Sequence, residues 1–158
     1  MSQAVFEKLL NLLEGKKVKF QLYEHQPVYT SQQAAGIRKT KIEQGAKALV
    51  MMADKKPILV VISAAKKVDF KKIKRIFGFR DLRMAKPEEV RKATGIEVGA
   101  VPPWGEVLNL PTFVDKSLGE NRKIVFNAGL HTKSIKMDYQ DYYLLVQPKL
   151  GDFSLTDE

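Results

Sequence analysis

The sequence predicts a single domain in which α-helices and β-strands are mixed. Three observations support this prediction. Apolar residues recur at helical spacing over residues 2–15 and 70–77. Residues 18–23 alternate between apolar and polar, and residues 45–52 and 58–62 form apolar runs of strand length. The chain has 158 residues, 44 % of them hydrophobic, which is enough for one well-formed core.

The expected elements follow one another with short connections. Amphipathic spacing, capping residues and terminal glycines predict helices at residues 2–15, 30–36, 69–78, 87–95 and 138–147. Alternation and short apolar runs predict strands at residues 18–23, 46–52, 58–62, 82–84, 112–115 and 123–128, and in the run before residue 138. The strands at residues 46–52 and 58–62 should form a hairpin. Residues 149–158 are expected to be a loose tail after a domain of residues 1–148.

One lysine interrupts the apolar strand at residues 46–52. Because side chains alternate along a strand, Lys47 points the same way as Leu49 and Met51 and the opposite way from Ala46 and Val50. Burying an unpaired ammonium group costs on the order of several kcal/mol. Two interpretations are open: Lys47 reaches water at the end of the strand, or it is kept in a pocket to hold a ligand's oxygen atoms. The strand by itself favours the first.

Composition excludes several classes of site. With no cysteine and only two histidines, the chain has no disulfide framework, no thiolate nucleophile, no zinc finger and no multi-histidine metal site of its own. The sequence motifs of phosphate loops, nucleophile elbows and zinc-protease helices are also missing. No metal and no cofactor is therefore expected. A hydrolase with this sequence would have to use lysine, hydroxyl groups, backbone amides and at most one histidine.

The charge balance suits an anionic partner. The chain has 27 Lys and Arg against 18 Asp and Glu, a net charge of +9, and nucleic acid is the commonest partner of such proteins. Four cations gather on the outer face of the helix at residues 70–77: Lys71, Lys72, Lys74 and Arg75. Such a face is usually only solvated, but this density favours contacts with phosphates. No apolar run reaches the ~20 residues of a membrane helix, and no secretory segment is visible, so a cytoplasmic protein is expected.

Residues 99–105, Gly-Ala-Val-Pro-Pro-Trp-Gly, predict a rigid loop. Its two prolines fix two φ angles, and its glycines leave backbone amides open to close approach. The alternative is an ordinary turn anchored by the only tryptophan of the chain.

Six short stretches occur together in one order. They are Glu24-His25 before residues 30–35, residues 45–50, residues 87–90 with Thr94-Gly95, residues 99–105, residues 114–118, and residues 126–129 with Ser134-Ile135. This series resembles the YbaK/ProX family of aminoacyl-tRNA deacylases, which is similar to the editing domain inserted in bacterial prolyl-tRNA synthetase. The resemblance covers about residues 5–147.

The resemblance implies a fold and a reaction. The fold would be a compact α/β mixed (α+β) domain with a curved, partly barrel-like mixed sheet surrounded by helices. The reaction would be hydrolysis of the ester that joins a wrong amino acid, such as alanine, serine or cysteine, to the terminal adenosine of a tRNA. The expected partner is a mischarged aminoacyl-tRNA, and an aminoacyl-tRNA synthetase is a further one left open. The alternative function is a non-catalytic module that binds aminoacyl-tRNA or aminoacyl-adenylate ends.

The resemblance also implies a site. Lys47 falls on the family's characteristic lysine and Gly99 on the glycine of its Gly-x-x-x-Pro loop, which now favours the ligand-holding interpretation of Lys47. Lys47 would clamp the terminal phosphate or polarise the ester carbonyl, and amides of the Gly99 loop would receive the developing negative charge. His131 replaces a frequent arginine, and two interpretations are open: it orients a water or the substrate's amino group, or it has only a structural role. Substrate contacts are expected from His25, Tyr29, Thr30, Val101, Pro102, Pro103, Gly129 and Ser134.

Overall fold

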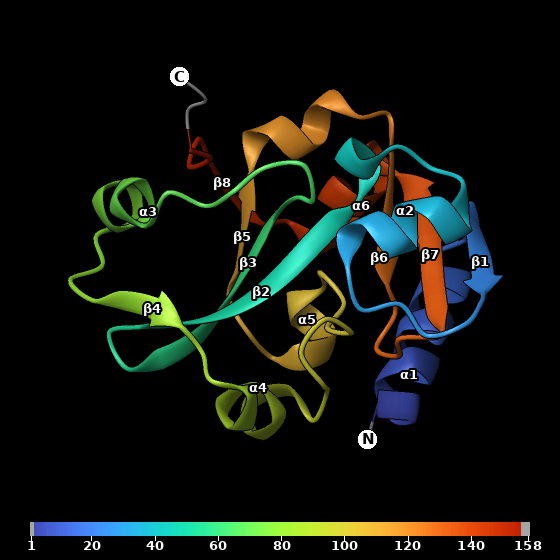
Figure 1. Cartoon of the computed structure of the whole chain (residues 1–158), viewed down its shortest axis with the longest axis horizontal. Helices are drawn as coiled ribbons and strands as arrows, with labels where there is room; N and C mark the ends of the chain where they lie inside the picture. Colours follow the sequence, from blue (N-terminus) through green and yellow to red (C-terminus); the bar gives the residue numbers. More distant parts are fainter. Residues whose placement is uncertain (1, 156–158) are drawn as a thin grey trace.

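The protein combines two β-sheets with surrounding helices (Figure 1). A computed structural model describes residues 2–155. One sheet is antiparallel in the order β1-β7-β6, and the other is mixed in the order β4-β2-β3-β5-β8. The strands are β1 (Phe20–Glu24), β2 (Ala46–Ala53), β3 (Lys56–Ser63), β4 (Leu82–Met84), β5 (Thr112–Asp115), β6 (Lys123–Asn127), β7 (Lys133–Asp138) and β8 (Lys149–Gly151).

Helices lie around both sheets. They are α1 (Ser2–Gly15), α2 (Ser31–Arg38), α3 (Phe70–Phe77), α4 (Pro87–Thr94), α5 (Gly105–Leu108) and α6 (Tyr139–Val146), with the short 3-10 helices η1 (Ile42–Gln44) and η2 (Lys116–Glu120). A parallel bridge between Gly45 and Val125 joins the two sheets. The predicted mixed α/β domain is confirmed. No helix within residues 2–155 is long and apolar enough to cross a membrane.

The β2–β3 hairpin separates two hydrophobic cores. The side chains of Ala46 and Val50 pack on the side that holds Trp104 and Tyr142. Met51 packs on the opposite side, which is covered by α3. The predicted hairpin and its alternation are therefore confirmed.

Helix α2 begins where the sequence predicts but ends later. Thr30 Oγ1 accepts a hydrogen bond from Gln33 N at 3.1 Å, as a capping residue does. The helix then passes through Gly36 and ends at Arg38, so the predicted end is wrong. A glycine inside a helix costs only ~1 kcal/mol, and the hydrogen bonds of the Arg38 side chain described below hold the last turn in place.

The expectation of a loose tail after residue 148 is also wrong. Residues 149–151 form β8, which pairs with β5, and Ser154 bridges to Val68. Phe153 is fully buried, and its N–H donates to Asp115 Oδ1 at 2.7 Å. One buried aromatic ring and one buried carboxylate thus fix a segment whose own sequence has no strand pattern. Residues 156–158 lie outside the described part of the chain.

Candidate active site

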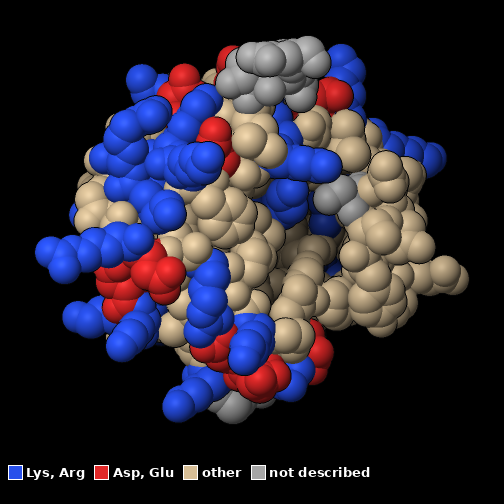
Figure 2. Space-filling view, turned by 60° about the vertical axis from the view of Figure 1, so that its left-hand side comes forward, with Lys and Arg blue, Asp and Glu red and all other residues tan. Residues whose placement is uncertain are grey.

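A cavity of about 210 Å³ opens beside β2. Its walls come from α2, η1, β2, the β4–α4 turn, the Gly99 loop (residues 99–104) and β6. The charged residues that line it are Arg38, Lys41 and Lys47, and no Asp or Glu of the described chain lines it. Figure 2 shows a hollow in the face of the molecule, with mostly uncharged walls and Lys and Arg side chains near its rim.

Lys47 lies in the wall of this cavity and is half-buried. Its Nζ donates to Lys66 O at 3.1 Å, and no carboxylate within residues 2–155 forms an ion pair with it. Burial, and then the charge of Lys67, lower the pKa of Lys47 below its usual value. The strand thus places a cation with no counter-ion against the cavity.

Gly99 faces the cavity with a left-handed backbone, φ 89°. A Cβ atom here would lie 3.2 Å from His131 Cε1, so a side chain would be both strained and crowded. The carbonyl oxygen of Gly99 accepts a hydrogen bond from Asn127 Nδ2. Ala100 N donates to Glu97 O at 3.1 Å, whereas the N–H groups of Gly99 and Val101 have no partner within residues 2–155. Within residues 2–155, these two amides are therefore free donors on residues that line the cavity.

The prolines of the loop lie behind the cavity wall. Pro102 and Pro103 are buried and are not among the lining residues. Pro103 O accepts a hydrogen bond from Tyr142 OH at 2.7 Å, and the fully buried Trp104 packs edge-on against the same tyrosine ring at 5.5 Å. The loop is thus both rigid and anchored by the tryptophan. The sequence did not predict the short helix α5 that follows, because four residues cannot show a helical period.

His131 lies beside the cavity and contacts two residues that line it. Its ring packs against the exposed Tyr29 at a centroid distance of 4.6 Å, and it closes over Gly99. Nδ1 donates to Val28 O at 3.0 Å, because a carbonyl can only accept, so Nε2 is the free nitrogen. Thr30 lines the cavity next to Tyr29.

A buried arginine that the sequence analysis missed supports the cavity from behind. Arg38 is 8 % exposed, lines the cavity, and donates from Nε to Ser134 Oγ at 2.9 Å and from Nη2 to Asn127 Oδ1 at 2.8 Å. Ser134 Oγ also bonds to His25 Nε2 at 2.7 Å, and His25 Nδ1 to Gln26 O at 2.8 Å. Burial lowers the pKa of Arg38 to about 10. Ser134 is therefore a partner of Arg38, His25 is a partner of Ser134, and neither residue lines the cavity.

Sequence alone could not separate Arg38 from the other basic residues of the chain, because its partners are about ninety residues away. The sequence feature that could have indicated a partner for a buried arginine was the motif that contains Asn127 and the nearby Ser134. Gly129, in the same motif, is buried, and its N–H donates to Ala100 O at 2.9 Å, so it holds the Gly99 loop rather than the cavity wall.

The cations of α3 do not line the cavity. Asp69 caps this helix by accepting from Lys71 N and Lys72 N, and Lys71 and Arg75 are exposed, while Lys72 and Lys74 are partly buried. The segment that precedes α3 contributes the Lys66 carbonyl that holds Lys47. The basic side chains of α3 are therefore close in sequence to the residue that holds Lys47, but they lie outside the cavity.

Three comparisons with known proteins agree. A family model described as the aminoacyl-tRNA editing domain matches residues 25–144. The multifunctional Ser/Thr-tRNA deacylase ProXp-y of Escherichia coli K12 is 31 % identical over 155 residues, covering 95 % of this chain and 93 % of its own. The prolyl-tRNA editing protein ProX of Acetoanaerobium sticklandii is 26 % identical, covering 98 % and 96 %. A crystal structure described as a candidate trans-editing enzyme for prolyl tRNA synthetase superimposes with a TM-score of 0.84 at 25 % identity, covering 96 % and 98 %.

These findings confirm the resemblance inferred from the sequence and, at the level of the family, the expected class of enzyme, an aminoacyl-tRNA deacylase. The chain belongs to the aminoacyl-tRNA editing domain family.

Proposed function

We propose that this protein is a cytoplasmic trans-editing deacylase that hydrolyses the ester of mischarged tRNA in the cavity beside β2. The observation that carries the proposal is the lining of this cavity: its only charged residues within the described chain are cations, and one of them is the family lysine, Lys47. Such a cavity suits a ligand that carries phosphate groups and an ester. A pure binding module would not need both Lys47 and a loop with free amides.

The amino acid is expected to be small. The cavity measures about 210 Å³, and many of its walls are small side chains, among them Ala34, Ala35, Ala48 and Ala64. The E. coli relative is named for Ser/Thr-tRNA, which agrees with a small side chain. We infer that alanine, serine, threonine or cysteine esters are the candidates.

Lys47 would clamp the terminal phosphate or polarise the ester carbonyl. The N–H groups of Gly99 and Val101 would receive the negative charge that develops on the carbonyl oxygen, and a donor of this kind is typically worth ~3 kcal/mol of the barrier. A hydroxyl group at the 3′ end of the tRNA would organise the attacking water. Lys47 is a poor nucleophile for this reaction, because it would form an amide too stable to turn over.

His131 would assist at the mouth of the cavity. Its free Nε2 can accept a hydrogen bond from a water or from the substrate's amino group, which an arginine could not do. The α3 cations, among them Lys71 and Arg75, would contact phosphates of the tRNA outside the cavity.

The experiment that tests the function is a deacylation assay with a panel of tRNAs mischarged with small amino acids. The proposal expects release of at least one amino acid well above spontaneous hydrolysis. Tight binding of the same tRNAs without release would instead support the non-catalytic module, and an aminoacyl-tRNA synthetase added to the assay would show whether a partner supplies tRNA selectivity.

A further inference from the structure

The edge of β2 is open where it lines the cavity. On one side β2 pairs with β3 along its whole length, from Ala46 to Ala53. On the other side, the bridge between Gly45 and Val125 closes one end, and Ala85 N donates to Val50 O at 3.1 Å at the other end. Between these two closures no strand of residues 2–155 pairs with β2, and the open stretch centres on Ala48.

The register shows which way the backbone of Ala48 faces. Leu59 N donates to Pro111 O at 2.9 Å, so the backbone of Leu59 faces β5. Successive residues of a strand turn their backbone groups to opposite edges, so Val60 faces β2, where it is paired with Leu49. Ala48 must then turn both its N–H and its C=O to the open edge, as Val50 does. No group within residues 2–155 bonds to either.

The cavity also lacks the usual partner for an amino group. An aminoacyl ester carries an ammonium group on the carbon next to its carbonyl. Within the described residues, no carboxylate lines the cavity that could pair with this ammonium group. The free carbonyl of Ala48 is a neutral acceptor, and its N–H is a donor on the same edge. Open strand edges are ready to pair with another peptide-like group.

We propose that the open edge of Ala48 is the subsite for the aminoacyl group of the substrate. The Ala48 C=O accepts from the α-ammonium group, and the Ala48 N–H donates to the ester carbonyl oxygen. Two facing residues of an antiparallel sheet exchange their two hydrogen bonds in the same way, so the amino acid binds as a strand of one residue. This subsite rests on the proposed deacylase function and deepens it.

The pairing fixes where the substrate's side chain goes. Facing residues of an antiparallel pair project their side chains to the same face of the sheet. The amino acid therefore points to the same face of the sheet as the methyl group of Ala48. Lys47 projects to the opposite face, which leaves its ammonium group available for a phosphate.

The role of the Ala48 N–H as a donor to the substrate is tested by replacing a single backbone group. Incorporation of the α-hydroxy acid analogue at position 48 changes one N–H to oxygen and keeps the methyl group. The single-turnover rate on the best tRNA of the panel should fall at least ~10-fold, since loss of a transition-state donor typically costs 10²–10³. The unfolding midpoint should fall less than in the control below, because the replaced N–H has no partner within residues 2–155 and only the Lys47 carbonyl, paired with β3, becomes a weaker acceptor.

The matched control is the same replacement at Leu59, whose N–H is used in the sheet. It should lower the unfolding midpoint and leave the rate of the folded enzyme unchanged. This crossed result separates a substrate contact from a general effect of the ester bond.

The role of the Ala48 carbonyl as an acceptor is tested by changing the amino group of the substrate. The wild-type protein should hydrolyse the best aminoacyl-tRNA faster than its 2-hydroxyacyl counterpart, each rate being divided by the spontaneous one. An α-hydroxy acid at position 49 makes the Ala48 carbonyl a weaker acceptor and should reduce this preference. If the wild type is active and neither replacement changes rate or preference, the subsite is wrong while the proposed function stands. A wild type that hydrolyses no ester overturns both.

Discussion

Two cations with different partners border the cavity, and their chemistry differs. Arg38 is held by Ser134 and Asn127, so its position is fixed from behind the wall. Within the described chain, Lys47 makes a single hydrogen bond, to a carbonyl group, so it can turn toward a ligand. The sequence showed Lys47 as a charge in an apolar strand, but only the family resemblance favoured a ligand-holding role for it. It could not point to Arg38, whose burial depends on residues of β6 and β7.

The lowered pKa of Lys47 predicts how stability depends on pH. The unfolded chain holds this proton up to about the usual 10.5, whereas the folded protein releases it at lower pH. The protonated lysine therefore costs folding free energy, and this cost disappears as pH rises through the lowered pKa toward 10.5. Urea unfolding of wild type and Lys47→Met, from neutral pH to pH 10.5, should show the wild type gaining stability relative to the variant. If the unfolding free energies of the wild type and the variant changed in parallel with pH, burial would not lower the pKa of Lys47.

Gly99 should be needed for stability as well as for activity. Alanine at φ 89° costs about 1–2 kcal/mol, and its Cβ would crowd His131. Gly99→Ala should lower both the unfolding free energy and the deacylation rate. Gly36→Ala is the matched control: it lies within α2 with open space around it, and should stabilise by up to ~1 kcal/mol. Equal stability of the two variants would contradict the strained conformation of Gly99.

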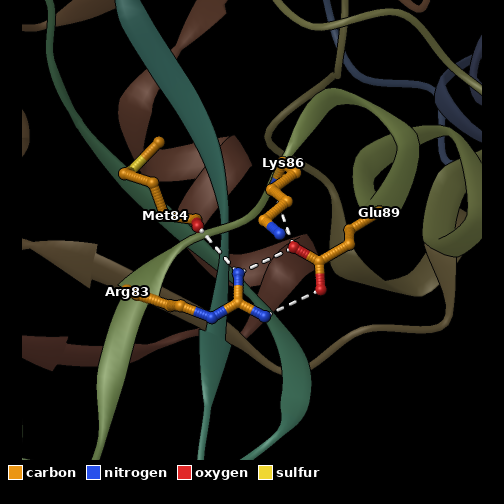
Figure 3. Close-up of polar contacts among 4 residues, drawn as sticks. All are labelled: Arg83, Met84, Lys86 and Glu89. Carbon is orange, nitrogen blue, oxygen red and sulfur yellow. Dashed lines mark hydrogen bonds and ion pairs between the residues drawn. The ribbon is translucent and has the colours of Figure 1, made fainter.

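At the scale of elements, hydrogen bonds among Arg83, Met84, Lys86 and Glu89, together called the clasp, stabilise the part of the cavity wall formed by the β4–α4 turn (Figure 3). Arg83 donates from Nη1 and Nη2 to the two carboxylate oxygens of Glu89, at 2.7 and 2.8 Å, and from Nη1 to Met84 O at 3.2 Å. Lys86 N donates to Glu89 Oε1 at 2.8 Å, which satisfies the start of α4 without a capping side chain. Met84 and Ala85, inside this clasp, line the cavity.

The clasp predicts a stability change in acid. The hydrogen bond from Arg83, more than any other contact, lowers the pKa of Glu89 from 4.5 to about 2. The ionised carboxylate therefore stabilises the folded state at neutral pH, and this contribution is lost as pH falls from 4.5 to about 2. The wild type should lose stability relative to Glu89→Gln in this range, by a small amount because the pair is exposed. Glu88→Gln, at an exposed position one residue away, should show no such difference.

Prediction succeeded for elements whose signal lies within their own residues. Helix α3 has its apolar stripe, Asp69 as a cap and Gly78 as a left-handed end, all readable in sequence. Strand β8 and the end of α2 depend on contacts with distant residues, and were missed for that reason. A sequence motif drew attention to Lys47 and the Gly99 loop, which line the cavity, but the open edge at Ala48 appears only once the register of β2 is known.

At the scale of the molecule, positive charge extends from the cavity to α3. The loop before this helix holds Lys47 through the Lys66 carbonyl, and Lys67 lies close enough to affect its pKa. Figure 2 shows Lys and Arg side chains gathered on the same face as the hollow. A tRNA with its 3′ end in the cavity could therefore place acceptor-stem phosphates near α3.

Charge reversal on α3 should weaken tRNA binding without affecting the chemical step. The double variant Lys71→Glu, Arg75→Glu should raise KM, leave kcat unchanged, and make the salt dependence of kcat/KM less steep, because fewer counterions are released. The control reverses the exposed Lys8 in α1 and Lys16, which follows the end of this helix; α1 lies on the opposite side of the molecule from α3 (Figure 1). Equal effects of the two pairs would indicate only a general response to net charge.

The most direct test of the account is the single-turnover rate of deacylation by Lys47→Ala on the best mischarged tRNA. The account predicts a fall of at least ~10²-fold, in the range of lost transition-state donors, with the unfolding midpoint retained because Lys47 fills no hydrophobic space. A rate within a few-fold of wild type would contradict the assignment of the site to this cavity. A lost rate with a large fall in the unfolding midpoint would make Lys47 a structural residue.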